Sequence, residues 1–180
     1  MKKPKTFFVA SAAIALALVF SVTAFSTAAA APAKPAETTD LTDAEIEGLL
    51  FMREEEKLAH DVYTVFFEQW GLTLFNNIAS SEQSHTDAVL AILSTNGIDD
   101  PAAGLAIGEF ANADLQALYN DLIAQGGQSL EAALRVGAEI EEIDILDLME
   151  ELELTENADI VWMYENLLKG SYNHLRAFTR

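Results

Sequence analysis

The sequence predicts an all-α fold of four long helices, with a long crossover between the second and the third. After Thr39, apolar residues recur at spacings of three and four, the period of a helix with one buried face. No segment shows the sustained alternation expected of a half-buried strand. Two short links flank one long connection, Gly97–Gln128. These observations together favour a helical bundle with a single crossover.

Residues 1–31 are expected to be a signal peptide that is not part of the fold. Three lysines stand among the first five residues, an apolar run extends from Phe7 to Phe25, and the small residues of 26–31 offer cleavage sites. The protein is therefore predicted to be secreted or periplasmic. The alternative is an uncleaved membrane anchor, since the apolar run approaches spanning length. Residues 32–40 are interpreted as a flexible lead-in, and 41–180 as one helical domain with a sizeable core.

Composition narrows the set of partners. The formal net charge is −19, and removal of the three signal-peptide lysines makes the exported part more negative still. Nucleic acid and anionic membrane surfaces are poor partners for such a surface, whereas metal cations are good ones. A second copy of the chain, giving a homodimer, is also kept as a candidate partner. Because the chain has no cysteine, disulfides, iron–sulfur clusters and thiolate zinc sites are excluded.

The first two long helices have recognisable ends. Thr42–Glu45 has the pattern of a capping box, and helical periodicity continues from there to Trp70, where Gly71 ends the helix. The second helix is expected from about Leu74 to Thr95, before an Asn-Gly pair.

The second half of the chain contains one short helix and two long ones. The short amphipathic helix is expected at Asn112–Gln125, where two glycines stop it. The third long helix starts at the N-cap Ser129 and reaches about Leu152, and the fourth spans about Asn157–Phe178.

Glu82 and His85 form a Glu-x-x-His pair on the second long helix. Side chains three residues apart project from the same helix face, so a carboxylate and an imidazole at this spacing can hold one metal ion. Helical bundles that bind two iron or manganese ions use such pairs together with glutamates from facing helices. The alternative is a surface pair at the polar edge of the helix.

Glu56 on the first helix is a candidate partner for this pair. It shares a face with Ala59, which leaves room for an ion, and with Tyr63. The opposite interpretation is that the acidic run of residues 54–56 is a solvated face. Tyr63 is a candidate catalytic residue that could give an electron or a hydrogen bond to the site, and the alternative is an ordinary core tyrosine.

The third and fourth helices offer further candidates. Glu141 and Asp144 lie within an apolar face of the third helix, although periodicity alone does not decide which of its carboxylates points inward. His174 lies among apolar residues of the fourth helix. A lone histidine there is either a metal ligand or a core histidine satisfied by a hydrogen bond.

Four segments of the chain resemble the ferritin-like superfamily, and in particular a bacterial exported family of unassigned function with a rubrerythrin-like four-helix domain. The segments are Glu55–Tyr63, Ile78–His85, Ile140–Ile145 and Gly170–Phe178. The order short link, long crossover, short link is also the ferritin-like connectivity. A four-helix bundle without metal is the alternative to this architecture.

The resemblance implies a ligand set of Glu56, Glu82, His85, Glu141 and His174. The chain departs from a symmetric two-metal pattern because Ser171 stands where a second Glu-x-x-His would place a carboxylate. Asp144 is the candidate that fills this gap. The alternatives are an asymmetric site, a site for one metal, or a site that has lost its oxidase chemistry.

Oxygen-rich sites with one or two imidazoles suit iron or manganese, as one or two ions. The sequence therefore predicts an exported di-metal oxidase or peroxidase that handles peroxide, dioxygen or ferrous iron. The competing hypothesis is a non-catalytic helical module that binds a partner or sequesters metal.

Overall fold

The structure, a computed structural model, describes residues 41–180. The predicted signal peptide and lead-in, residues 1–40, lie outside the described residues. The described part contains five helices and no strand, which confirms the all-α prediction for this region. The helices are α1 (Asp43–Trp70), α2 (Thr73–Thr95), α3 (Ala113–Gly126), α4 (Leu130–Glu153) and α5 (Ala158–Phe178).

The ends of α1 and α2 follow local chemistry. The capping box forms as predicted: Thr42 Oγ1 accepts a hydrogen bond from the Glu45 backbone N–H at 3.2 Å, and the Glu45 carboxylate accepts one from the Thr42 N–H at 2.8 Å. Helix α1 ends at Gly71, whose φ of 67° lies in the left-handed region that glycine adopts without strain. Helix α2 begins at Thr73, one residue earlier than expected, without a side-chain cap from Leu72.

Polar side chains cap the remaining three helices. Asn112 accepts from the first backbone N–H groups of α3, Ser129 from those of α4 and Asn157 from those of α5. Two of these residues were expected to be the first of their helix and instead precede it as the cap. The predicted boundaries are otherwise within about one residue because capping depends on neighbours in the sequence.

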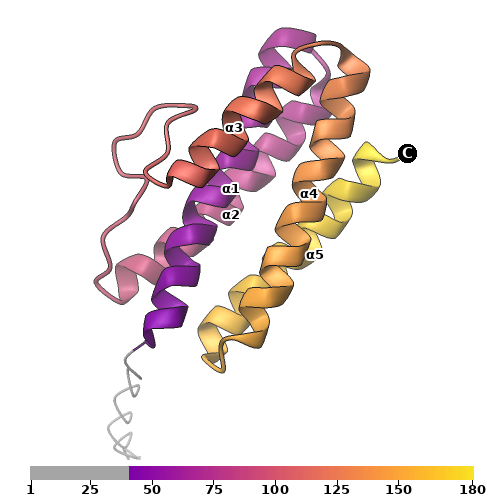
Figure 1. The fold of residues 1–180 in the computed structure, drawn as a ribbon. Coiled ribbons are helices and arrows are strands. Elements are labelled where there is room, and N and C mark those ends of the chain that lie inside the picture. The colour runs from indigo at the N-terminus through magenta and orange to yellow at the C-terminus, as the bar shows by residue number, and fades with distance from the viewer. Residues whose placement is uncertain (1–40) are drawn as a thin grey trace, which may run out of the picture. The chain divides into compact units, whose positions relative to one another are not determined.

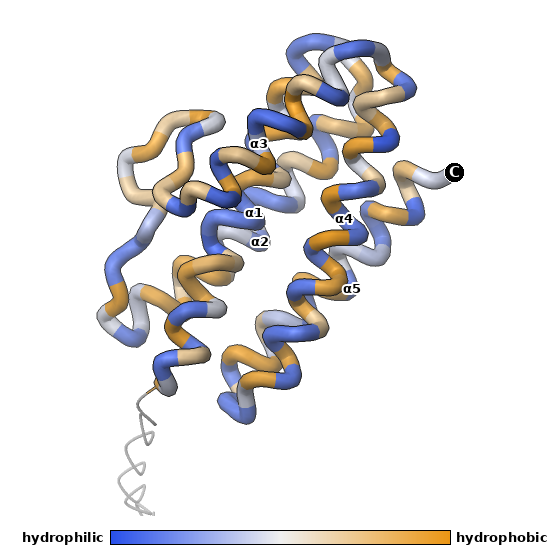
Figure 2. Tube along the Cα trace, in the orientation of Figure 1, coloured by the Kyte–Doolittle hydropathy of each residue, from blue (hydrophilic) through white to orange (hydrophobic). Residues whose placement is uncertain are grey.

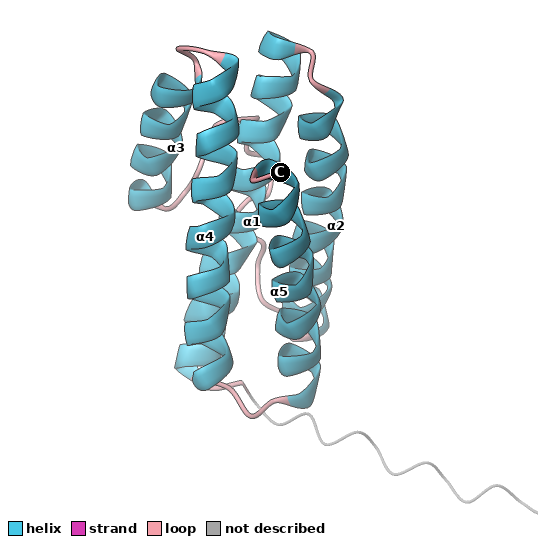
Figure 3. Cartoon of the chain, turned by 90° about the vertical axis from the view of Figure 1, so that its right-hand side faces the viewer, coloured by secondary structure: helices cyan, strands magenta, loops and turns pink. Residues whose placement is uncertain are grey.

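The helices form two hairpins that pack on each other. A two-residue link joins α1 to α2, and residues 154–157 join α4 to α5. Helix α1 contacts α4, and α2 contacts α5, so the four long helices lie side by side (Figures 1 and 3). The predicted long connection runs from α2 to α4, and it includes α3, which packs against α1 and α4.

The interior consists of two apolar clusters with a polar layer between them. One cluster contains Leu58, Tyr63, Phe66, Phe75, Ile140 and Phe178, and the other contains Leu49, Met52, Val89, Leu148 and Leu167. Between these positions on all four long helices stand buried polar residues: Glu56 on α1, Glu82 on α2, Glu141 and Asp144 on α4, and Ser171 on α5. The helices therefore place a set of polar side chains midway along a hydrophobic core.

Apolar residues cover only part of each helix surface. Figure 2 shows hydrophobic and hydrophilic positions along every helix. Within residues 41–180, no helix combines the length and the apolar character needed to cross a membrane.

Gly137 tests the close packing of α4 against α5. A Cβ atom at this position would lie 2.5 Å from the Phe178 ring, which also packs against Tyr63 and Phe75. A glycine-to-alanine change inside a helix normally stabilises by about 1 kcal/mol. We expect Gly137→Ala to destabilise instead, because overpacking typically costs about 1–3 kcal/mol. The free energy of unfolding in denaturant measures the effect.

Gly48→Ala is the matched control. A Cβ atom there would meet the carboxylate end of Glu151, a flexible side chain that can move aside. We expect this variant to be at least as stable as the wild type. Equal stabilisation by both substitutions would contradict the packing argument.

Candidate metal centre

The acidic run on α1 is buried, and its three side chains contact different neighbours. Glu54 accepts hydrogen bonds from the backbone N–H groups of Ala111 (2.6 Å) and Asn112 (2.8 Å), which ties the crossover to α1. Glu55 faces α4, and Glu56 faces His85 of α2. Glu56 is only 1% exposed, so it points inward and the solvated-face alternative is wrong.

Glu82 lies between the two histidines. Its Oε2 is 2.7 Å from His85 Nδ1, and its Oε1 is 2.7 Å from His174 Nδ1. His85 Nδ1 is also 3.2 Å from Glu56 Oε2, and His174 Nδ1 is 3.4 Å from Glu141 Oε2. The two imidazole rings stack with centroids 5.6 Å apart. The Glu82 carboxylate thus presents one oxygen to each imidazole.

Neighbouring residues fix the orientation of the histidines. His174 Nε2 lies 3.0 Å from the Ser81 hydroxyl, which leaves Nδ1 facing Glu82 and Glu141. Gly170 leaves room for His85, since a Cβ atom there would be 2.5 Å from His85 Nε2. Sequence reasoning gave Ser81 no role. Its position next to Glu82 was visible in the sequence, but its contact with His174 of α5 depends on how the helices pack and could not be predicted from local patterns.

Two groups of side chains have the composition and spacing of metal sites. The first contains Glu56, Glu82 and His85, the second contains Glu82, Glu141 and His174, and within each the ligand atoms lie within 4.8 Å of one another. Glu82 belongs to both groups. The structure therefore brings together five of the six predicted ligands, whereas their binding of metal stays a prediction.

Several atoms of this cluster lack a hydrogen-bond partner. They are Glu56 Oε1, Glu82 Oε1, His174 Nδ1 and Asp144 Oδ1. Glu82 Oε1 and His174 Nδ1 are close in distance, but they are not aligned for a hydrogen bond. Buried polar atoms without partners are costly. The ligand atoms around one metal ion likewise lie close together without forming hydrogen bonds to one another. The donor set therefore fits cations.

Asp144 is the predicted residue that stands outside both groups. It is buried beside them, close enough to Glu56, Glu82 and Glu141 for their charges to act on it. Ser171 is fully buried in the same layer, and its hydroxyl donates to the Leu167 carbonyl at 3.0 Å.

Glu55 was missed by sequence reasoning. It is buried next to Asp144 and Asp147, and its Oε2 has no hydrogen-bond partner. Helical periodicity could not reveal this, because α1 is surrounded on several sides and consecutive residues all become buried.

Tyr63 contacts the second group directly. Its hydroxyl donates to Glu141 Oε1 at 2.7 Å and approaches the Gly137 carbonyl at 3.2 Å. Burial, together with the nearby Glu141 and Glu82, raises the pKa of Tyr63 well above its usual value, so the phenol is neutral. The hydrogen bond that sequence reasoning considered is present, and the catalytic role stays a prediction.

The imidazoles and Glu82 form a charged set when no metal is bound. Burial lowers the pKa values of His85 and His174, but the close carboxylates of Glu56, Glu82 and Glu141 outweigh it and raise them to about 11 and about 10. Burial raises the pKa of Glu82, but its close contacts with both histidines prevail and lower it to about 2. Both imidazoles therefore carry protons that a metal ion must displace.

The remaining carboxyl groups hold protons more strongly than usual. Burial is the main cause in each case, and it raises the pKa of Glu56 and of Glu141 to about 7. Burial and neighbouring carboxylates raise the pKa values of Asp144 and Glu55 well above the usual range. Such a cluster holds protons unless a cation replaces them.

Known proteins are similar to this chain in sequence and in fold. The chain belongs to the family described as "Uncharacterized protein domain (DUF2202)", which matches residues 45–180 and so includes every candidate ligand. It is 49% identical over 140 residues to the uncharacterized protein MJ0754 of Methanocaldococcus jannaschii, covering 78% of this chain and 76% of that protein. The crystal structure of hypothetical protein MJ0754 from Methanococcus jannaschii DSM 2661 is similar, with a TM-score of 0.76 and 47% identity over 83% of each chain.

The raised pKa values predict how stability depends on pH in metal-free protein. Glu56 and Glu141, with folded pKa values of about 7, stabilise the fold fully below about 4.5, and this contribution is lost as pH rises through 7. The contributions of His85 and His174 are full below about 6.5 and are lost as pH rises toward 10 or 11. We expect the melting temperature of chelator-treated protein to fall between about pH 5 and about pH 8.

Added Mn²⁺ provides the comparison. Because metal binding releases protons from the same groups, its stabilising effect should grow with pH over that interval. A metal-free melting temperature that rises from about pH 5 to about pH 8 would contradict the assigned directions of the pKa shifts.

Proposed function

We propose that the protein is an exported, ferritin-like metal-binding protein that holds two iron or manganese ions in the polar layer. Its activity would be that of an oxidase or peroxidase toward peroxide, dioxygen or ferrous iron. The observation that carries this proposal is the convergence of three glutamates and two histidines from four helices around the shared carboxylate of Glu82.

The architecture supports the ferritin-like part of the proposal. Two helical hairpins are joined by a long crossover, and the candidate ligands come from all four long helices at mid-length. Bundles of this class place a Glu-x-x-His pair and facing glutamates in their core. The Glu82–His85 pair and the facing Glu56 and Glu141 follow that arrangement.

The donor chemistry supports iron or manganese. Each three-residue group offers two carboxylates and one imidazole, a mixed oxygen and nitrogen set that suits these metals. Bound there, such ions would supply electron-transfer chemistry toward oxygen species. The first group would hold one ion and the second group the other, with Glu82 shared between them.

The protein's own residues would position and isolate the site. Ser81 holds the His174 ring by its Nε2 atom, and Tyr63 holds Glu141 by a hydrogen bond to Oε1. The apolar clusters on both sides exclude bulk water from the layer. Tyr63, as a neutral buried phenol, keeps its proton and donates a hydrogen bond to Glu141 on that side of the layer.

A second candidate function is metal sequestration without redox turnover. Ser171 favours it, because this buried hydroxyl occupies the place of a carboxylate in the symmetric two-metal pattern. Peroxide discriminates the two functions. A redox centre should change its absorption spectrum and turn over, whereas a sequestering protein should hold metal unchanged.

Metal analysis of His85→Ala tests the proposal. Wild-type protein produced without a chelating tag should contain about two ions per chain. The variant loses the imidazole of the first group, so we expect metal affinity to fall at least about tenfold. The melting temperature should fall with it, since bound metal stabilises only the folded state.

His60→Ala is the matched control, because His60 is on α1 but belongs to neither group. It should retain wild-type metal content. Wild-type protein that binds no iron or manganese after loading would reject the proposed function, and full metal content in His85→Ala would remove His85 from the ligand set.

Asp144 provides a separate prediction. It is buried beside both groups and can supply the carboxylate that Ser171 lacks, provided that its shorter side chain reaches the ion. We expect Asp144→Asn to lower occupancy of the second ion while sparing the first. Metal titration followed by direct quantification measures the stoichiometry.

Asp147→Asn, one turn further along α4, is the control and should leave both ions in place. A wild-type stoichiometry of one ion, unchanged in Asp144→Asn, would reject the two-ion site and leave sequestration of a single ion as the better function.

A further inference from the structure

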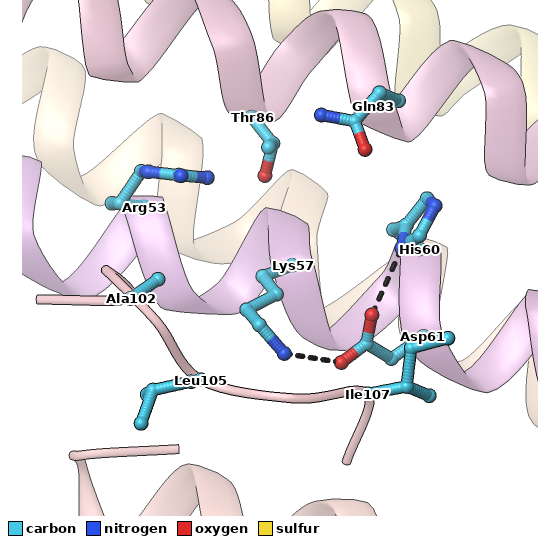
Figure 4. A pocket seen from close by; sticks show the side chains of 9 residues that line it. All are labelled: Arg53, Lys57, His60, Asp61, Gln83, Thr86, Ala102, Leu105 and Ile107. Carbon is cyan, nitrogen blue, oxygen red and sulfur yellow. Dashed lines mark hydrogen bonds and ion pairs between the residues drawn. The ribbon is translucent and has the colours of Figure 1, made fainter. Parts of the chain in front are cut away.

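A separate cavity lies between α1, α2 and the crossover. Its volume is about 250 Å³, and Figure 4 shows the side chains that line it. They are Arg53, Lys57, His60, Asp61, Gln83, Thr86, Ala102, Leu105 and Ile107. None of the six candidate metal ligands is among them, so this cavity is distinct from the centre described above. Its volume suits a molecule of several non-hydrogen atoms, since one water occupies about 30 Å³.

Ionic contacts hold the crossover wall of the cavity in place. The Arg53 guanidinium donates to both oxygens of Asp100, from Nε and Nη2, at 3.0 Å each. Asp61 accepts from the Gly108 backbone N–H at 2.9 Å, and Lys57 donates to the Ala106 carbonyl at 2.9 Å. The cavity is therefore preformed rather than a gap beneath a loose loop, which lowers the entropic cost of binding.

Two polar atoms of the lining have no partner. They are Arg53 Nη1 and Thr86 Oγ1. Arg53 is only 8% exposed and Thr86 only 4%. Figure 4 shows the guanidinium of Arg53 and the hydroxyl of Thr86 pointing into the space between α1 and α2. Buried donors that lack an acceptor destabilise the protein, so a ligand that brings oxygen acceptors to these groups is the complement this cavity needs.

The guanidinium donors of the lining favour an anion as the source of these oxygen acceptors. Arg53 and Lys57 are two of the six lysines and arginines within residues 41–180, in a chain with formal net charge −19. A guanidinium presents its donors in a planar fork that matches a carboxylate or a phosphate. Asp100 pairs with Arg53 and Asp61 with Lys57, so these charges balance, which favours a small group of low charge over a polyanion.

We propose that this cavity is a binding site for the oxoanion group of a small molecule, held by the Arg53 guanidinium and the Thr86 hydroxyl. Lys57 adds positive charge beside the bound group, and Gln83 lines the α2 side. The site takes one compact carboxylate- or phosphate-bearing molecule. It does not depend on the metal centre, and its test requires no metal-dependent activity.

Thr86→Val tests the proposal because valine keeps the shape of threonine and removes only the hydroxyl. Sodium acetate and inorganic phosphate are the probes, titrated at constant ionic strength while calorimetry or backbone amide NMR follows binding to purified protein. We expect saturable binding of at least one probe, with shifts at Arg53 and Thr86. Thr86→Val should weaken that binding about fivefold, the typical effect of losing one hydrogen bond.

Thr95→Val is the matched control. Thr95 is on the same helix, exposed and remote from the cavity lining, and its hydroxyl donates only to the Ala91 carbonyl. It should bind the probe as the wild type does. Stronger binding of acetate identifies a carboxylate as the natural group, and stronger binding of phosphate identifies a phosphoryl group. Absence of saturable binding by both probes, or equal affinity in wild type and Thr86→Val, would overturn the proposal and leave water as the partner of these donors.

Discussion

The contact of the buried Glu82 carboxylate with two imidazoles is the interaction on which the rest of this structure depends. A carboxylate that is 2% exposed is costly unless it is partnered, and here His85 and His174 approach separate oxygens. The two histidines belong to different hairpins, so this contact also joins α2 to α5. Ser81 and Gly170 then determine how closely the rings approach.

The apolar clusters on each side give this polar layer its chemical character. They keep water away from it, and a low local dielectric strengthens every charge interaction within it. Burial raises the pKa values of Glu56 and Glu141, whereas for Glu82 the contacts with both histidines outweigh burial and lower the pKa. Without a bound cation, several groups of the layer therefore hold protons, and this is the physical basis for proposing that it binds metal.

Sequence reasoning predicted what depends on near neighbours. Helix ends were accurate because caps such as Thr42 and Ser129 act within a few residues. The Glu82–His85 pair was visible because three-residue spacing fixes a common face. The inward direction of Glu56 and the burial of Glu55 could not be derived, since α1 is enclosed by α2, α3 and α4 at once. The Arg53–Asp100 pair and the cavity beside it depend on the path of the crossover, which local patterns do not specify.

The three consecutive glutamates of α1 have a consequence for how this sequence tolerates change in length. Glu54 contacts the crossover, Glu55 contacts α4 and Glu56 contacts α2. Each of these three sides of α1 therefore packs against a different element. One inserted residue upstream turns everything beyond it by about 100° about the helix axis, which would exchange all three assignments at once. The first half of α1 is therefore expected not to tolerate the insertion or deletion of a residue.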